Sequence, residues 1–194
     1  MNAPGDTVRE RIIAEATRLI VAYGYDGVAM REIAAAVGIS KPGLYYHFRD
    51  KEDLLEAVLT YWIAETEALV AEARRAPDTR GRLTTLVRGL FAQAPTQRAL
   101  IRLGTQDLPR LREDVRATIR RCYAGGFLEP IEAIIREGVE RGDLRPVDPH
   151  IVTWLLLGML YPFFHTDHPS GELAGAATAT LIVDTLLDGI GARA

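Results

Sequence analysis

A short stretch of the chain concentrates side chains that bind other molecules through charge, hydrogen bonds and flat rings: Lys41, Tyr45, Tyr46 and His47. Lysine attracts anions, while tyrosine and histidine offer hydroxyl and imidazole hydrogen bonds. Leu44 and Phe48 are four residues apart, so on a helix they share one face and leave the polar side chains on the others. We therefore interpret this stretch as a helix with an exposed binding surface.

Two short helices and a tight turn are predicted to position this surface. The first runs from about Met30 to Val37, Gly38 interrupts its apolar pattern, and Ser40 is a suitable N-cap for the second. Pro42 is tolerated there because the first turn of a helix has no intrahelical N–H bond to lose. A helix, a short turn and a second helix form the helix-turn-helix geometry, in which the second helix enters the major groove of DNA.

The rest of the chain predicts an all-α fold with about nine helices. Thr7 and Glu10 have the spacing of a capping box before the first helix, and Gly24 is its expected end. Asp50 is the expected cap of a long fourth helix that ends before Pro77. Later helices are predicted at about residues 80–94, 96–103, 109–124, 131–140, 149–164 and 172–190. The glycines at 125 and 126 and the proline at 130 are expected to break or kink the chain.

Composition excludes several classes of protein. The 194 residues, 48% of them hydrophobic, are enough to bury a core, and the single cysteine, Cys122, excludes an intrachain disulfide and fits a reducing cytosol. The net charge is −3, and residues 1–51 hold seven Lys/Arg against six Asp/Glu, a balance of +1, so nucleic-acid binding must come from a local patch. The N-terminus lacks an apolar signal core, and the apolar run 151–164 is shorter than the ~20 residues that span a bilayer. We expect a cytoplasmic protein that contacts no membrane.

The segment at 23–59, YGYDGVAMREIAAAVGISKPGLYYHFRDKEDLLEAVL, closely resembles the N-terminal domain of the TetR (tetracycline repressor-like) family of bacterial transcriptional regulators. The resemblance covers about residues 8–60 and continues in the general pattern G-x-L-R-x-x-D-P at 142–149. It implies a three-helix DNA-binding domain at 1–51, joined by the long fourth helix to a helical effector-binding and dimerisation domain at 52–194. Mapped onto this sequence, the family's DNA-contacting residues are Arg31, Lys41, Pro42, Gly43, Tyr45, Tyr46, His47 and Lys51.

The chemistry of these residues suggests separate roles. Arg31 is the one able to make a bidentate contact to guanine, worth ~1–3 kcal/mol of discrimination. Lys51, in the first turn of the fourth helix, is expected to anchor a phosphate without reading sequence. Pro42 and Gly43 present an apolar ring and bare backbone, which favours readout by shape and methyl contact. Simpler roles stay open: packing for either tyrosine, a structural hydrogen bond for His47 and a solvated helix start for Lys51.

One position departs from the family's pattern. The family usually has threonine or serine where this chain has Ala29, capping the second helix and touching a phosphate. Loss of that hydroxyl is expected to cost about 1 kcal/mol in helix capping and to weaken the phosphate contact at this corner.

The C-terminal two-thirds shows no pattern of a catalytic site, so we predict neither enzyme activity nor a cofactor. His165, Asp167 and His168 form the one cluster with metal-binding chemistry, but their proline-bounded loop favours a polar surface turn, and we predict no metal site. Cys122 lies among arginines; a redox-sensing thiolate and an ordinary buried thiol are both open, with the second favoured.

We expect the C-terminal part to bind a partly apolar small-molecule effector and to form a homodimer. Residues that can line an effector pocket are Trp62, Phe91, Arg102, Tyr123, Phe127, Trp154, Met159 and Tyr161, with ordinary core packing as the alternative for each aromatic residue. The segment 154–164 is apolar nearly all round, so the last two helices are predicted to pair with a second copy through Leu155, Leu181 and Leu187.

These features together predict a ligand-responsive repressor. A two-fold dimer sets two recognition helices ~34–36 Å apart, which matches successive major grooves of near-palindromic double-stranded DNA. An activator and a helical binding module with a weakened DNA head remain alternatives. An enzyme would rest only on His165 and His168.

Overall fold

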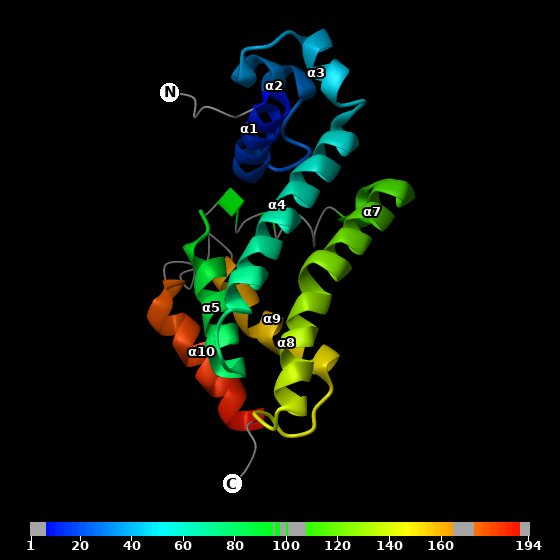
Figure 1. The fold of residues 1–194 in the computed structure, drawn as a ribbon. Helices are drawn as coiled ribbons and strands as arrows, with labels where there is room; N and C mark the ends of the chain where they lie inside the picture. Colours follow the sequence, from blue (N-terminus) through cyan, green and yellow to red (C-terminus); the bar gives the residue numbers. More distant parts are fainter. Residues whose placement is uncertain (1–6, 95, 98–99, 101–107, 165–172, 191–194) are drawn as a thin grey trace.

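In the computed structural model, residues 7–94, 96–97, 100, 108–164 and 173–190 are described. All the secondary-structure elements of these residues are helices, which confirms the predicted all-α class. The molecule is elongated, with three short helices at one end, a helical bundle at the other and one long helix running between them (Figure 1). We call the first three helices the head and the helices after the long one the body.

The head consists of α1 (Val8–Tyr23), α2 (Met30–Val37) and α3 (Lys41–His47), as predicted. The predicted capping box starts α1: the backbone N–H of Thr7 donates to Glu10 Oε2 at 2.6 Å, and the N–H of Glu10 donates to Thr7 Oγ1 at 3.2 Å. Gly38 ends α2 with a φ of 78°, a left-handed conformation that favours glycine. Arg11 then donates to the carbonyl oxygen of Val37 at 2.9 Å, which fixes α2 to α1.

The long helix α4 (Lys51–Ala73) takes part in two separate hydrophobic cores. Its first half, through Ile63, packs in a first core with α1, α2 and α3. Its second half supplies Val70 and Ala73 to a second core in the body. Because one continuous helix is built into both cores, a tilt of α4 in the body carries the head with it.

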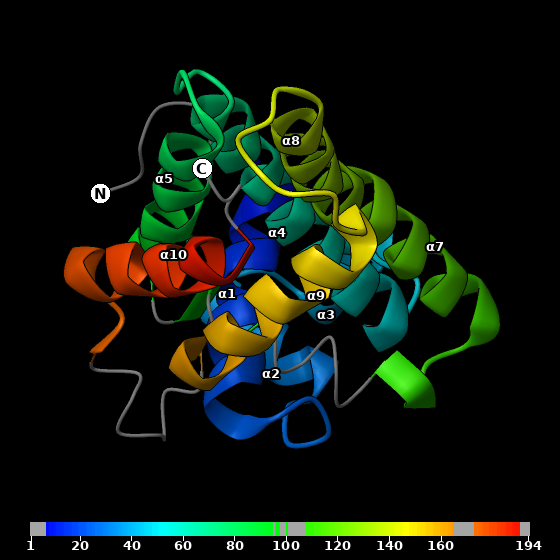
Figure 2. The same ribbon diagram turned by 90° about the horizontal axis from the view of Figure 1, so that it is seen from below.

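The body contains α5 (Thr79–Ala92), α7 (Glu113–Tyr123), α8 (Glu129–Glu140), α9 (Pro149–Leu160) and α10 (Ala176–Ile190). In the view from below, α5, α8, α9 and α10 surround the body end of α4 (Figure 2). The helix α5 packs between α4 and α10, and α8 packs on α9. Unlike the other body helices, α7 contributes Val115 and Ile119 to the first core, beside the head.

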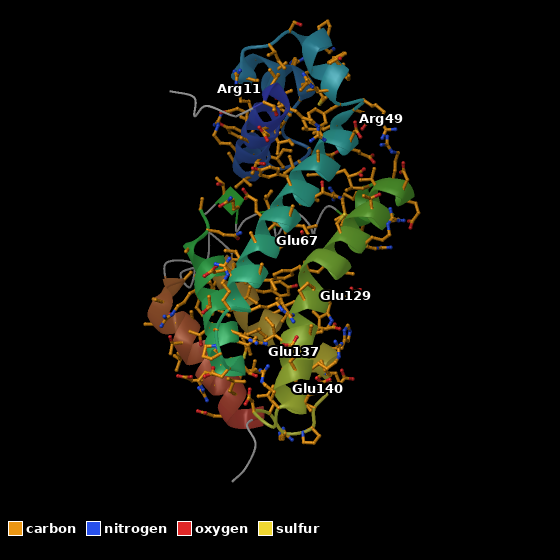
Figure 3. The ribbon with its side chains drawn as sticks, in the orientation of Figure 1. Arg11, Arg49, Glu67, Glu129, Glu137 and Glu140 are labelled. Carbon is orange, nitrogen blue, oxygen red and sulfur yellow. The ribbon has the colours of Figure 1, made fainter. Side chains whose placement is uncertain are left out.

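Of the break or kink predicted after residue 124, the break is wrong. A π-helical turn, η2 (Ala124–Leu128), joins α7 directly to α8. Pro130 lies in the first turn of α8, where a missing N–H is tolerated. Gly126 is explained by close packing: a Cβ there would lie 2.5 Å from Glu67 Oε1 and 2.9 Å from Ile63 Cγ2 of α4. Figure 3 shows Glu67 on this middle part of α4. The glycine lets two helical segments approach closely instead of ending one of them.

Several helix ends differ from the prediction. The helix predicted to begin at residue 109 is preceded by a short 3-10 turn, η1 (Leu108–Arg110), and α7 itself begins at Glu113. The helix predicted to reach residue 164 ends at Leu160 and continues as the 3-10 turn η3 (Tyr161–Phe164), which contains Pro162. The helix expected at 96–103 lies largely outside the described residues. None of the described helices has the length and apolar character needed to cross a membrane.

Candidate DNA-binding surface and effector cavity

The residues expected to contact DNA gather at one end of the head. The start of α2, the whole of α3 and the start of α4 meet there (Figure 1). Tyr46 is 87% exposed and Tyr45 is 43% exposed, so neither is buried as a packing residue. Arg31, Lys41 and Pro42 are also exposed, while Gly43, His47 and Lys51 are half-buried. All eight predicted residues are therefore at least partly accessible to a partner molecule.

The helix α3 is fixed by its cap and its buried face. Ser40 Oγ accepts a hydrogen bond from the N–H of Gly43 at 3.1 Å, as its N-cap position predicts. Leu44 is fully buried and Phe48 is 2% exposed, so the opposite side of the helix is anchored in the first core. Lys41, Tyr45 and Tyr46 remain exposed on this anchored helix, which is what a surface that reads DNA requires.

The cap of α2 is half complete. The N–H of Ala29 donates to Glu32 Oε2 at 2.7 Å, which is the reverse half of a capping box. The other half is absent because alanine has no side-chain acceptor, and Ala29 makes no side-chain cap bond. Glu32 thus preserves the start of α2 although the hydroxyl expected at position 29 is missing.

Lys51 is held by an aromatic ring that sequence reasoning did not identify. Its Nζ lies 4.3 Å from the centroid of the Tyr25 ring, a cation–π distance. Tyr25 belongs to the connection between α1 and α2, so this contact links that connection to the start of α4. The two residues are 26 positions apart, and no spacing rule relates residues across such a separation. Asp50, beside Lys51, caps α4 by accepting from the N–H of Asp53 at 2.8 Å.

Arg112, just before α7, neutralises two carboxylates next to Lys51. Its Nη1 donates to Asp50 Oδ2 at 2.6 Å, and its backbone N–H donates to Glu52 Oε2 at 2.9 Å. Arg110 pairs in the same way with Asp26 of the head at 3.1 Å. Partial burial acts to raise the pKa of Asp50, but hydrogen bonds from Arg112 and the Asp53 amide outweigh it and the pKa is lowered. These contacts bind the α7 segment to the head.

A mainly apolar cavity of about 370 Å³ lies between α4, α7 and α9. Four predicted pocket residues line it: Trp62, Tyr123, Trp154 and Tyr161. Among the described residues, the apolar lining is Leu59, Ile63, Leu100, Leu108, Pro109 and Ile119, and the charged one is Arg120. The hydroxyls of Tyr123 and Tyr161 are 3.5 Å apart, and burial raises the pKa of Tyr123 so that its hydroxyl stays protonated. A second hollow, of about 650 Å³ beside α1, includes Glu10, Glu15 and Glu65 and suits an apolar molecule less well.

The other predicted pocket residues lie elsewhere. Phe91 packs against the rings of Phe163 and Phe164 in the second core. Phe127 is 2% exposed behind the cavity wall, in ring contact with Trp62 and Tyr123. Met159 packs against the second core, and Arg102 lies outside the described residues. Phe91, Phe127 and Met159 therefore pack in or against the core and do not line the cavity.

Two of the three predicted dimer residues are exposed on the last two helices. Leu155 on α9 is 53% exposed and Leu181 on α10 is 65% exposed, although both are large apolar side chains. Leu187 is different: it is 4% exposed and belongs to the second core of its own protomer. Leu187 is therefore not available for contact with a second copy of the chain. Ile151 and Trp154 are the further exposed apolar residues of α9.

Neither alternative ligand chemistry gains support from the described residues. Cys122 is half-buried and packs against the first core, which is the environment of an ordinary structural thiol. The part of the chain that the structure describes contains no cluster of His, Cys, Asp or Glu able to hold a metal ion. His165, Asp167 and His168 lie outside that part.

Known proteins match both parts of this chain. Residues 12–58 match the model of bacterial regulatory proteins of the TetR family, and residues 76–190 match the tetracyclin repressor-like C-terminal domain. The transcriptional regulator YvaF of Bacillus subtilis strain 168 is 24% identical over 93% of this chain and 94% of its own length. The transcriptional repressor DhaR of Mycobacterium sp. strain GP1 is 27% identical over 71% of this chain and 70% of its own.

Solved structures agree with these matches. The structure of AibR in complex with isovaleryl coenzyme A and operator DNA is 27% identical, covers 92% of this chain and 97% of AibR, and superposes with a TM-score of 0.76. Family models together cover most of the sequence, from the head through α10. The chain therefore belongs to the TetR family of bacterial regulatory proteins.

Proposed function

We propose that this protein is a cytoplasmic homodimeric repressor that binds a near-palindromic operator and is released from it by a small molecule. The observation that carries the proposal is the exposed surface of α3, with a further exposed cation, Arg31, on the adjoining helix α2 and another cation, Lys51, at the start of α4. A rigid helix that exposes Lys41, Tyr45 and Tyr46 beside two further cations has the composition of a surface that contacts phosphates and base edges.

The exposed apolar residues of α9 and α10 supply the second requirement. Leu155 and Leu181 are large, exposed and on helices that contact each other, which favours burial against a second copy. A two-fold axis through this face relates two heads at one end of the assembly. Spacing of the recognition helices by one turn of DNA, ~34–36 Å, then matches the two halves of a palindrome.

The segment from Leu108 to Tyr123 connects ligand binding to the head. Leu108, Ile119 and Tyr123 line the cavity, whereas Arg110 and Arg112 in the same segment pair with carboxylates of the head and of the start of α4. A ligand that displaces this segment therefore acts on the head both through α4 and through these ion pairs. Couplings of ~1–3 kcal/mol are typical of such linkage. The structure of AibR in complex with both isovaleryl coenzyme A and operator DNA supports the same two-ligand function.

Selection of DNA fragments bound by the full-length protein tests the proposal. We expect enrichment of an inverted repeat with half-sites one helical turn apart, and a reporter gene behind that site distinguishes repression from activation. Lys51→Ala is expected to weaken binding similarly on all sequences and to lower the slope of log affinity against log salt by about 0.9, since it removes one phosphate contact. The matched control is Arg75→Ala, an exposed cation at the far end of α4 that pairs with Glu72 of its own helix. Absence of any enriched repeat, or an unchanged salt slope in Lys51→Ala, contradicts the proposal.

A further inference from the structure

We propose that His150 is a positioning residue of the dimer face and makes dimerisation depend on pH. The dimer face is the exposed apolar surface of the last two helices: Ile151, Trp154, Leu155 and Leu181. The neutral imidazole of His150 holds the Trp154 indole in the orientation on which a second copy packs, and a second proton on the ring releases it. This inference rests on the proposed function, because it concerns how the two copies are held together.

Trp154 is the largest side chain of this face. It shares one side of α9 with Ile151 and Leu155, because residues at i, i+3 and i+4 of a helix are neighbours. Gly158, one turn farther along the same side, is exposed, and a Cβ there would meet open space, so another backbone has room to approach. An indole supplies a large rigid area to an interface, so its orientation decides the shape that a second copy meets.

A chain of two hydrogen bonds holds the indole. Trp154 Nε1 donates to His150 Nε2 at 3.2 Å, and Nδ1 of the same imidazole lies 2.7 Å from Glu132 Oε1. The two rings meet edge to face, with centroids 6.3 Å apart and planes at 76°. An indole N–H can only donate, so Nε2 must be the acceptor, and the proton of the neutral ring is on Nδ1, where it donates to Glu132. The geometry thus requires one tautomer of His150.

The far end of this chain is anchored in the protomer. Glu132 belongs to α8, which packs on α9, and its side chain is only 17% exposed. His150 lies in the first turn of α9, where its backbone N–H donates to Asp148 Oδ1 at 2.8 Å. Glu132 therefore orients the imidazole, and the imidazole in turn orients the indole on the exposed face.

A second proton on His150 removes the acceptor that Trp154 needs. The proton binds Nε2, because Nδ1 already carries one, and the imidazolium then directs an N–H at the indole N–H. Two donors that face each other cannot bond, so the indole leaves the position that the partner contacts. Histidine is the side chain that ordinarily changes charge between about pH 5 and pH 8, so this release falls within a range that the folded protein can be studied in.

The charged groups around His150 favour the protonated ring. Glu132 lies at Nδ1 and Asp148 at the backbone N–H, so two carboxylates are close to the imidazolium. The helix α10 and the turn η3 also pack on α9, but in the described part of the chain no charged side chain of either lies within ion-pair distance of the imidazole. The titratable group of η3, Tyr161, contacts Tyr123 instead. Protonation therefore costs the contact to the indole and keeps the contact to Glu132.

The rate of subunit exchange tests the inference. Two populations of the full-length protein, labelled at the N-terminus with a donor and an acceptor dye, are mixed without DNA at about pH 8 and at about pH 5.5, and energy transfer reports how fast dimers separate. We expect exchange in wild type to be about tenfold faster at the lower pH, because each dimer loses two hydrogen bonds, one in each protomer.

Four variants separate His150 from other causes of a pH effect. His150→Gln keeps an acceptor for the indole and a donor for Glu132 but does not titrate, so exchange is expected to stay slow at both pH values. His150→Ala lacks the acceptor and is expected to exchange rapidly at both. Trp154→Phe keeps a ring and loses the N–H, so its exchange is expected not to depend on pH. The matched control is His47→Gln, a histidine of the head, which keeps the pH dependence of wild type.

Three results overturn the inference: exchange in wild type that does not depend on pH, a pH dependence that persists in His150→Gln, or one that persists in Trp154→Phe. A wild-type dimer whose exchange rate is the same at both pH values refutes the role of His150 and leaves the dimer and operator binding intact. A protein that is monomeric at both pH values contradicts the proposed function as well.

Discussion

The head and the body place their functional residues in opposite settings. In the head, Tyr45, Tyr46 and Arg31 stand exposed on short helices whose other faces are buried. Where α4 meets the body, Trp62 of α4 and Tyr123 of α7 line a cavity, and both helices also supply ordinary core. A polar or aromatic side chain on the solvent face of a helix is conspicuous, whereas an aromatic side chain among apolar neighbours looks like packing. Candidate functional residues of the head can therefore be recognised in the sequence, whereas those that line the cavity cannot be distinguished from core residues.

The two regions also differ in how they are held together. The head depends on short helices around one core, while the body adds a second core and a close helix contact at Gly126. They are joined by α4 and, beside it, by the ion pairs of Arg110 and Arg112. The head acts as a unit carried by the body, and variants in each region are expected to have different consequences.

The largest effect is expected when the body loses its partner. In the double variant Leu155→Glu with Leu181→Glu, charges replace two exposed apolar side chains on the proposed dimer face, which prevents its burial. Since each half-site then binds alone, operator affinity is expected to fall by about 100-fold or more. Light scattering gives the oligomeric state and a binding titration gives the affinity.

The control for that variant is Ala71→Glu, a charge at an exposed position of α4 in the body. It is expected to leave a dimer with normal affinity. A dimer that persists in the double variant places the interface elsewhere on the molecule.

Sequence reasoning predicted most of the fold, because helix caps and glycine stops act locally. The bounds of α2 and the capping box of α1 follow from such signals. The prediction was wrong at Gly126, where a tertiary contact with α4 and not a turn requires glycine. Two residues near the proposed DNA-contacting surface, Tyr25 and Arg112, were missed since each acts on Lys51 or its neighbours across a long separation in sequence.

The body was harder to predict than the head for a related reason. Four of the eight residues proposed for the cavity do line it, while Phe91 and Phe127, which are also aromatic, are core residues. Leu187 and Leu181 are both apolar residues of α10, yet one is buried and the other exposed. Which face of an apolar helix remains uncovered depends on the packing of the other helices, and periodicity alone does not contain that information.

A second, smaller effect, on stability, is expected from a change at the contact between α4 and the π-helical turn η2. Gly126→Ala forces a Cβ against Ile63 and Glu67 and is expected to destabilise the protein by about 1–3 kcal/mol, as overpacking does. Gly125→Ala is the matched control, because a Cβ at that position meets open space and is expected to be neutral or slightly stabilising. Urea unfolding followed by circular dichroism measures both variants. Equal stability of the two would show that the close approach at Gly126 carries no energetic cost.

A third effect is confined to one base pair of each half-site and tests the head alone. Arg31→Ala is expected to remove ~1–3 kcal/mol of discrimination at that position, as loss of a bidentate contact to guanine does, while stability stays unchanged. Operator variants with single base changes, titrated against both proteins, measure the preference. Arg18→Ala serves as control, because Arg18 pairs with Glu15 on its own helix. An equal loss of affinity on operator and random DNA would instead make Arg31 a phosphate contact.

The smallest effect is expected at the second connection between the regions. Arg112→Gln removes the cation that pairs with Asp50 and Glu52, and because the pairs are exposed the loss of stability at neutral pH is expected to be slight. The pKa of Asp50 is lowered in the folded protein, so its contribution is present above the unfolded pKa of about 3.9 and is lost as the pH falls further. The stability difference between wild type and variant is therefore expected to be constant from about pH 5 to 8, to begin to fall near pH 4 and to disappear as the pH drops through the lowered pKa of Asp50.

Unfolding curves recorded across this pH range measure that difference, with Arg75→Gln as control, since its partner Glu72 lies on the same helix and does not connect the regions. The same Arg112→Gln protein separates the two routes of coupling between cavity and head. If α4 alone transmits the effect of a ligand, release from the operator is unchanged in the variant. If the ion pairs contribute, a saturating ligand lowers operator affinity by a smaller factor than in wild type, because one of the two connections has already been removed.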